Sequence, residues 1–209
     1  MKTIVIKINS TKPQLSKIKK AADVLRNGGL VAFPTETVYG LGANLLDRKA
    51  VRKLYEIKKR PRNKPLTIHV AGIEAVEAMV GRMPEKAKIL AEEFWPGPLT
   101  LILKDDNGKK TGFRIPDNKA ALLLLKAAGV PVVAPSANLS GCLPPADAKE
   151  AFDNFNGNIE MVLDGGRARI GVASTVVEAG SRGYKILREG AISRARIQEV
   201  LSKSLGGAR

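Results

Sequence analysis

Apolar residues recur along this chain in two patterns that alternate from one end to the other. Residues 3–8 are β-branched at alternating positions, which predicts a strand, and residues 13–26 follow the helical period until Gly28 and Gly29 stop it. The same periodicities predict further strands at residues 30–33, 66–70, 99–103, 111–115, 132–134, 161–163, 174–177 and 184–187. They predict further helices at residues 47–59, 74–80, 84–94 and 117–128 and after Ser193.

Several predicted helices begin at residues that suit a helix N-terminus, and Pro84 suits a first helical position. The expected caps are Asp47, Asp117 and Ser193. Residues 105–108 and 181–183 are expected to form hairpin turns. Because no repeat or linker interrupts the alternation, we expect a single α/β domain over residues 1–209, with a twisted mixed β-sheet flanked by helices.

The net charge of the chain indicates which kinds of ligand it could bind. The 209 residues include 35 Lys and Arg against 20 Asp and Glu, a formal net charge of +15. Such a field attracts polyanions, including nucleic acid, nucleotide phosphates and acidic membranes, although a solvated basic surface would explain it equally well. With only five Phe, three Tyr and one Trp, a single-strand reader built on stacked aromatic rings is disfavoured.

Cys142 and His69 are the only residues of their types, so neither an intrachain disulfide nor a zinc cage of Cys and His can form. No apolar run approaches a membrane-spanning length, and residues 1–6 lack a signal-peptide pattern. The expected location is the cytoplasm. His69 lies within an apolar strand pattern, where a structural role is more common than ligand binding.

Three polar loops adjoin predicted buried strands, the position where ligands collect in α/β sheets. The first, residues 34–40, offers the Thr35 and Thr37 hydroxyls and the Glu36 carboxylate. These hydroxyls either face a ligand or satisfy their own backbone.

The second loop has five cations in the seven residues 58–64, followed by Pro65. Part of this charge complements a helix C-terminus, but the stiff prolines favour a fixed clamp for phosphates. In the third loop, residues 134–141, Ser136 and Asn138 stand two apart and would face the same way in an extended segment. They either hold phosphate oxygens or cap the next element.

Taken together, these segments resemble the YrdC-like family of threonylcarbamoyl-AMP synthases in its short form, without an extra C-terminal domain. The matching pieces occur in the family's order between about residues 13 and 197. They are residues 33–44 (FPTETVYGLGAN), 58–60 (KKR), 64–66 (KPL), 95–100 (WPGPLT), 113–116 (FRIP), 135–141 (PSANLSG), 174–177 (STVV) and 187–190 (LREG).

The resemblance implies a fold with a basic concave face and a reaction of L-threonine, bicarbonate and ATP. Its products would be threonylcarbamoyl-AMP and pyrophosphate, and the adenylate would pass to a tRNA threonylcarbamoyl-transferase complex. Mg²⁺ would arrive with ATP rather than on protein ligands. The resemblance includes tRNA or double-stranded RNA as a further partner and no membrane.

The resemblance also implies roles for individual residues. The catalytic tetrad would be Lys58, Arg60, Ser136 and Asn138. ATP would be bound by Arg60, Lys64, Asn138 and Arg188. Threonine would be bound by Thr35, Thr37, His69, Arg114, Ser136 and Ser174.

Some positions depart from the family pattern, namely Asn118, Ala146, Ala173, Glu178 and Glu189. A non-catalytic protein that binds double-stranded RNA or tRNA is the main alternative, because a net charge of +15 would support it. The tetrad distinguishes the two readings, since phosphate binding alone would not require Ser136 and Asn138. A carbamoyl-transfer module like those of hydrogenase-maturation proteins is a further alternative, but those modules accompany zinc-finger segments that this sequence lacks.

Overall fold

A computed structural model describes residues 2–181 and 183–206. The strands are β1 (Ile4–Lys7), β2 (Val31–Phe33), β3 (Gly40–Asn44), β4 (Thr67–His69), β5 (Leu99–Lys104), β6 (Lys110–Arg114), β7 (Val132–Val133), β8 (Met161–Asp164), β9 (Thr175–Gly180) and β10 (Gly183–Arg188). The helices are α1 (Leu15–Arg26), α2 (Arg48–Ile57), α3 (Ile73–Val80), α4 (Glu85–Phe94), α5 (Lys119–Ala128), α6 (Ala148–Phe155) and α7 (Arg194–Gly206).

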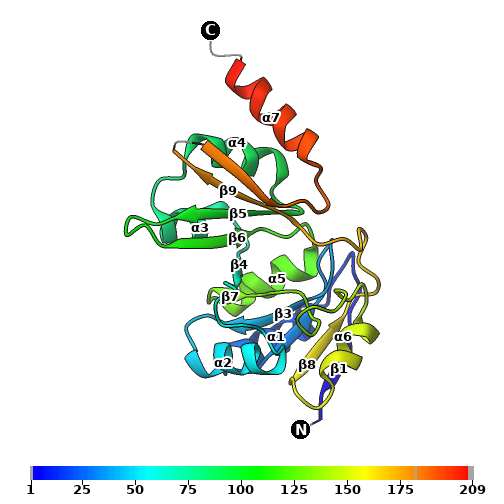
Figure 1. Cartoon of the computed structure of the whole chain (residues 1–209). Coiled ribbons are helices and arrows are strands. Elements are labelled where there is room, and N and C mark those ends of the chain that lie inside the picture. Colours follow the sequence, from blue (N-terminus) through cyan, green and yellow to red (C-terminus); the bar gives the residue numbers. More distant parts are fainter. Residues whose placement is uncertain (1, 182, 207–209) are drawn as a thin grey trace.

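The described strands form one sheet in the order β1-β8-β2-β3-β7-β4-β6-β5-β9-β10. The sheet contains both parallel pairs, such as β1 with β8 and β4 with β6, and antiparallel pairs, such as β2 with β3 and β5 with β6. In Figure 1, β1 and β8 lie at the lower end and β9 and α7 at the upper end, with β4 and β7 between them. The predicted α/β class, a mixed sheet flanked by helices, is confirmed.

The alternation of side chains along β2 shows how the sheet divides the core. Val31 and Phe33 pack with the apolar faces of α1 and α5. Ala32, between them, belongs to the larger cluster on the other side, which includes buried residues of α2, α4 and α6. Successive side chains of a strand point to opposite faces, so this short buried strand serves both layers.

β3 was not predicted, because its sequence Gly-Leu-Gly-Ala-Asn is poor in β-branched residues. All five residues are buried, and the strand pairs with β2 and β7. A Cβ atom on Gly42 would lie 3.0 Å from the Phe33 ring and 3.2 Å from a methyl carbon of Val132. Glycine therefore permits close packing here, a tertiary requirement that propensity does not reveal.

Three helices differ from expectation, one in its existence and two in where they begin. α6 was not predicted, although Asp147 caps it by accepting a hydrogen bond from the Glu150 backbone amide at 2.9 Å. The expected cap Asp117 is wrong by one residue, because Asn118 Oδ1 accepts from the Ala121 amide at 3.1 Å. Pro84 precedes α4 at the cap position instead of opening its first turn.

The cap of the last helix and both hairpins are as expected where the structure describes them. The Ser193 hydroxyl accepts from the Arg196 amide at 3.3 Å. Strands β5 and β6 pair antiparallel across residues 105–108, and Gly183 pairs with Gly180 at the start of the β9–β10 hairpin. Arg182, in the predicted turn at residues 181–183, lies outside the described residues.

Candidate functional site

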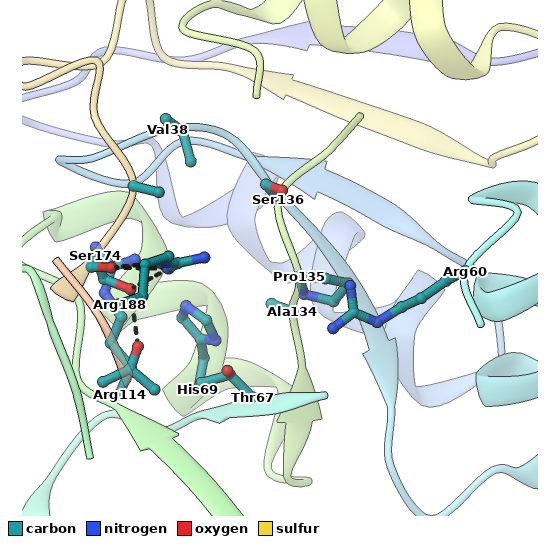
Figure 2. Close-up of a pocket in the computed structure, with 12 residues that line it drawn as sticks. Val38, Arg60, Thr67, His69, Arg114, Ala134, Pro135, Ser136, Ser174 and Arg188 are labelled. Atoms are coloured by element: carbon teal, nitrogen blue, oxygen red, sulfur yellow. Dashed lines mark hydrogen bonds between the residues drawn. The ribbon is translucent and has the colours of Figure 1, made fainter. Parts of the chain in front are cut away.

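A polar pocket of about 120 Å³ lies where β4, the end of β6, the segment after β7 and the start of β9 meet. It is lined by Val38, Arg60, Thr67, His69, Thr100, Arg114, Ala134, Pro135, Ser136, Ala173, Ser174 and Arg188. In Figure 2, Ser174, Arg188 and Arg114 gather at one end, His69 lies in the middle, and Arg60 lies beyond Pro135. Six of the predicted site residues line this pocket: Arg60, His69, Arg114, Ser136, Ser174 and Arg188.

Arg114, at the end of β6, is held by bonds on two of its three guanidinium nitrogens. Nη2 donates to Glu36 Oε1 and to Thr37 Oγ1, each at 2.7 Å, and Nε donates to the Gly97 carbonyl at 3.3 Å. The Arg114–Glu36 ion pair is almost fully buried, with side-chain exposures of 6% and 1%. Within the described residues Nη1 has no partner, and it is not among the buried unpartnered atoms. A charged donor is thus available at the pocket wall.

Ser174 and Arg188 form a second anchored group at the same end. Arg188 donates to the Ser174 carbonyl from Nε at 3.2 Å and from Nη2 at 2.8 Å, and the Ser174 hydroxyl lies 2.9 Å from that of Thr100. Burial, followed by the nearby charges of Arg114 and Arg60, lowers the pKa of Arg188 from its ordinary value. Arg60, Arg114 and Arg188 all line this pocket, which suits the binding of an anion.

His69 is neutral in this pocket. Its side chain is buried, its ring packs edge-on against Phe33, and Nδ1 has no hydrogen-bond partner among the described residues. Burial, assisted by the charge of Arg114, lowers the pKa of His69 to about 3. Because Nδ1 is buried, a ligand can meet only the other ring nitrogen, Nε2, which is not among the buried unpartnered atoms. A neutral imidazole can hydrogen-bond a ligand there, but it is a very weak base.

Lys58 occupies a different position from the one expected of a phosphate ligand. It is 1% exposed, and its ammonium donates to the Ser136 carbonyl at 2.6 Å and to the Asn138 carbonyl. Burial, followed by the charge of Arg60, lowers the pKa of Lys58 to about 8. In this conformation Lys58 ties the end of α2 to the third polar loop, and a direct phosphate contact stays a prediction.

Asn138 is also engaged within its own loop. Its Nδ2 donates to the Leu139 carbonyl at 2.8 Å and to the Cys142 carbonyl at 2.7 Å, while Oδ1 accepts from the Ser136 hydroxyl. Asn138 therefore fixes the loop from which Ser136 lines the pocket. The segments 58–60 and 136–138, predicted to form one site, are adjacent.

Arg60 and Lys64 are linked through the stiff loop after α2. Arg60 donates from Nε to the Lys64 carbonyl at 3.2 Å and from Nη2 to the Pro65 carbonyl at 2.7 Å, and its side chain lines the pocket. The side chain of Lys64 is exposed and lies outside the pocket lining. The structure brings Arg60 to the site and leaves the Lys64 side chain outside the pocket lining.

Thr35 and Thr37 lie behind the pocket, where they form a directed chain of hydroxyls. Thr35 Oγ1 donates to the Val38 carbonyl at 2.6 Å, so in its 2.9 Å contact with Thr37 it must accept. Thr37 Oγ1 then uses its lone pairs to accept from Arg114. Both threonines are buried and reach the pocket through Arg114 rather than directly.

Sequence reasoning assigned no role to Thr67 and Thr100, which also line the pocket. Thr67 stands two residues before His69 on β4, and this spacing could have identified it because such residues face the same side of a strand. Of the positions that depart from the family pattern, Ala173 lines the pocket, Asn118 caps α5, and Glu189 accepts from the Arg194 amide at 3.1 Å.

The ionisable residues that line the pocket are three arginines and the neutral His69, with the carboxylate of Glu36 behind Arg114. This excess of positive charge suits an anionic ligand. Among residues 2–181 and 183–206 no group of three His, Cys, Asp or Glu side chains could hold a metal ion. Over the same residues no helix is long and apolar enough to cross a membrane.

Comparison with known proteins links this chain to one family. A sequence profile of the Sua5/YciO/YrdC family, described as "Telomere recombination", matches residues 23–190. Threonylcarbamoyl-AMP synthases of Pyrococcus abyssi and Bacillus subtilis are 44% and 45% identical over 196 and 195 residues, or 90% and 88% of this chain.

A crystal structure of P. abyssi Sua5 complexed with L-threonine has a TM-score of 0.90 to this chain, with 42% identity, and covers 95% of this chain. The match spans 58% of the P. abyssi relative, 56% of the B. subtilis relative and 61% of the crystallised chain. The chain thus spans somewhat more than half the length of these relatives.

Proposed function

The chain belongs to the Sua5/YciO/YrdC family, and we propose that it converts L-threonine, bicarbonate and ATP to threonylcarbamoyl-AMP and pyrophosphate. The observation that carries this proposal is the likeness, at a TM-score of 0.90, to a relative crystallised with L-threonine. The pocket supports it, because its volume of about 120 Å³ and its cationic lining suit a small amino acid with a carboxylate.

The reaction balances as two steps. The neutral amine of threonine attacks bicarbonate, and loss of water gives a carbamate. A carbamate oxygen then attacks the α-phosphorus of ATP, the bond to the β,γ-phosphates breaks, and pyrophosphate leaves. The substrate supplies its own nucleophile, so the enzyme has to orient the reactants and neutralise charge.

At the end of the pocket formed by β6 and β9, Arg114 Nη1 and the Ser174 hydroxyl receive the threonine carboxylate, because a guanidinium and a hydroxyl are both suited to bind that anion. His69 contacts the amino acid as a neutral hydrogen-bonding group. Its pKa of about 3 makes it unsuited to remove a proton from the substrate ammonium near neutral pH.

At the other end, Arg60 and the Ser136 hydroxyl receive the phosphates. Arg188, beside Ser174, adds positive charge that neutralises the carbamate as it forms. Mg²⁺ belongs to the substrate in this proposal. Asn138 Oδ1, in the loop that carries Ser136, already accepts a hydrogen bond from the Ser136 hydroxyl. The described residues also offer no group of three His, Cys, Asp or Glu side chains for a metal, so they fit a Mg²⁺ ion that is held by the phosphates of ATP. The exposed Lys64, outside the lining, and the buried Lys58, bonded to the loop, add longer-range attraction for the triphosphate.

The adenylate would serve modification of the adenosine beside the anticodon of certain tRNAs, by way of a transferase complex in the cytoplasm. A non-catalytic RNA-binding role is not favoured, because the relatives with 44% and 45% identity are named as enzymes.

The test is incubation of the purified chain with ATP, Mg²⁺, threonine and bicarbonate, with pyrophosphate release and the adenylate followed by mass spectrometry. We expect release that depends on both threonine and bicarbonate and falls sharply when serine replaces threonine. Pyrophosphate release that is indifferent to threonine would disprove the proposal.

A further inference from the structure

The carboxylate of Glu36 is the least explained group near the pocket. It lies in the first polar loop and is 1% exposed, and its Oε1 accepts from Arg114 Nη2 at 2.7 Å. Its second oxygen, Oε2, is buried with no hydrogen-bond partner among the described residues. Glu36 does not line the pocket, so it cannot contact a ligand there directly.

This ion pair is a poor stabilising device. Two buried charges gain net stability only when their remaining donors and acceptors are satisfied. Here Glu36 Oε2 is buried and has no partner among the described residues. The pair does, however, fix the orientation of the Arg114 guanidinium. That group is held from two sides, by Glu36 and Thr37 in the loop after β2 and by Gly97 before β5.

The loop that carries Glu36 is itself anchored. The Glu36 carbonyl accepts from the Ile170 amide and the Thr37 carbonyl from the Gly171 amide, both at 2.8 Å. The Tyr39 hydroxyl donates to the Gly166 carbonyl at 2.6 Å. Glu36 is therefore held by its backbone as well as by its partner, which makes it a rigid point of attachment for Arg114.

We propose that Glu36 is a positioning residue for amino-acid recognition, which holds Arg114 so that Nη1 alone faces the pocket and receives the substrate carboxylate. This inference rests on the proposed function. Glu36 Oε1 and Thr37 Oγ1 occupy Nη2, so the substrate meets a donor fixed in direction. Without Glu36 the guanidinium can rotate, and the carboxylate then has to be captured by a mobile donor.

The experiment compares the wild-type chain with Glu36→Gln, Arg114→Gln and the double variant, using steady-state pyrophosphate release. Glutamine keeps the shape and one acceptor oxygen but loses the charge-assisted bond, so Glu36→Gln should remain folded. We expect its KM for threonine to rise about tenfold. The KM for ATP should change less than about twofold, because Arg60 and Ser136 are untouched.

The double variant separates positioning from direct contact. If Glu36 acts only through Arg114, Glu36→Gln should have no further effect on the threonine KM once Arg114→Gln is present. Additive effects, or an unchanged threonine KM in the single Glu36→Gln variant, would overturn the proposal. Circular dichroism and thermal unfolding report the folded fraction, and a loss of kcat in proportion to that fraction with unchanged KM would assign Glu36 a purely structural role.

Glu160→Gln is the matched control. Glu160 is a partly buried carboxylate paired with Lys53 at 2.6 Å, and it lies outside the pocket lining. Its substitution should leave both KM values unchanged. A wild-type chain that releases no threonine-dependent pyrophosphate would overturn the proposed function and this inference together, whereas an active wild type with an indifferent Glu36→Gln would overturn the inference alone.

Discussion

The buried ammonium of Lys58 gives a quantitative test of the site's construction. Lys58 is 1% exposed, and it donates to the Ser136 and Asn138 carbonyls, so it joins α2 to the loop that presents Ser136. Burial lowers its pKa from an ordinary 10.5 to about 8. The unfolded chain therefore holds this proton more tightly than the folded protein does.

The sign and size of the effect follow from proton linkage. As pH rises from 7.5 to 9.5 the folded protein releases the Lys58 proton while the unfolded chain largely retains it, so the free energy of unfolding increases. The contribution of this group is fully present above about pH 10.5 and lost as pH falls toward 8. Over the interval from pH 7.5 to 9.5 it amounts to about 2 kcal/mol.

The assay is urea unfolding of the wild type and Lys58→Met at both pH values. All other titrating groups are shared by the two proteins. We therefore expect the free energy of unfolding of the wild type, relative to that of the variant, to rise by about 2 kcal/mol between the two pH values. Lys49→Met is the control for removing a lysine from α2, because Lys49 is exposed. A difference that stays flat or shrinks would refute the placement of Lys58 as a desolvated cation between two carbonyls.

Three further predictions concern the pocket and its supports. Arg60→Ala should reduce threonine-dependent pyrophosphate release by about 10²-fold with an unchanged circular dichroism spectrum, and near-normal turnover would remove Arg60 from the phosphate site. In the folded protein His69 stays neutral as the pH falls from 7 to 5, whereas in the unfolded chain it takes up a proton. Relative to His69→Gln, the wild type should therefore lose about 2 kcal/mol of unfolding free energy over this interval, measured by urea titration. Gly42→Ala should lower the free energy of unfolding by about 1–3 kcal/mol in the same titrations, because the added Cβ would crowd Phe33 and Val132. An unchanged free energy would show that β3 is not closely packed at this position.

The sequence was sufficient for most of the fold because most elements carry their own local signals. The helix after Asp47 is an example, since its cap and its buried Ala50 and Leu54 all follow from the pattern. β3 escaped prediction because its glycines are explained by neighbours that are distant in sequence. The cap of α5 differed by one residue for a related reason: Asp117 instead pairs with Arg169 at 2.7 Å, a contact across 52 positions.

The site could be predicted as a set of segments but not as a set of contacts. The order of the motifs indicated that the segments carrying Arg60, Arg114 and Ser136 form one site, and all three residues line one pocket. Whether a side chain faces the ligand or the backbone behind it depends on tertiary partners, and Lys58 and Asn138 both turn out to bond the loop itself. Their spacing is compatible with either outcome, so sequence alone could not decide between them.

The charges of the pocket lining also restrict where its pH dependence can arise. The arginine side chains remain cationic at physiological pH, and His69 stays neutral until the pH falls to about 3. The lining residues that face the ligand therefore keep a constant charge between pH 5 and 7. We therefore expect a change of turnover in that interval to come chiefly from the substrates, through the fraction of threonine whose amine is unprotonated and the supply of bicarbonate. A pocket of fixed positive charge favours the neutral amine over the ammonium, so the same arginines that hold the anions also assist formation of the nucleophile.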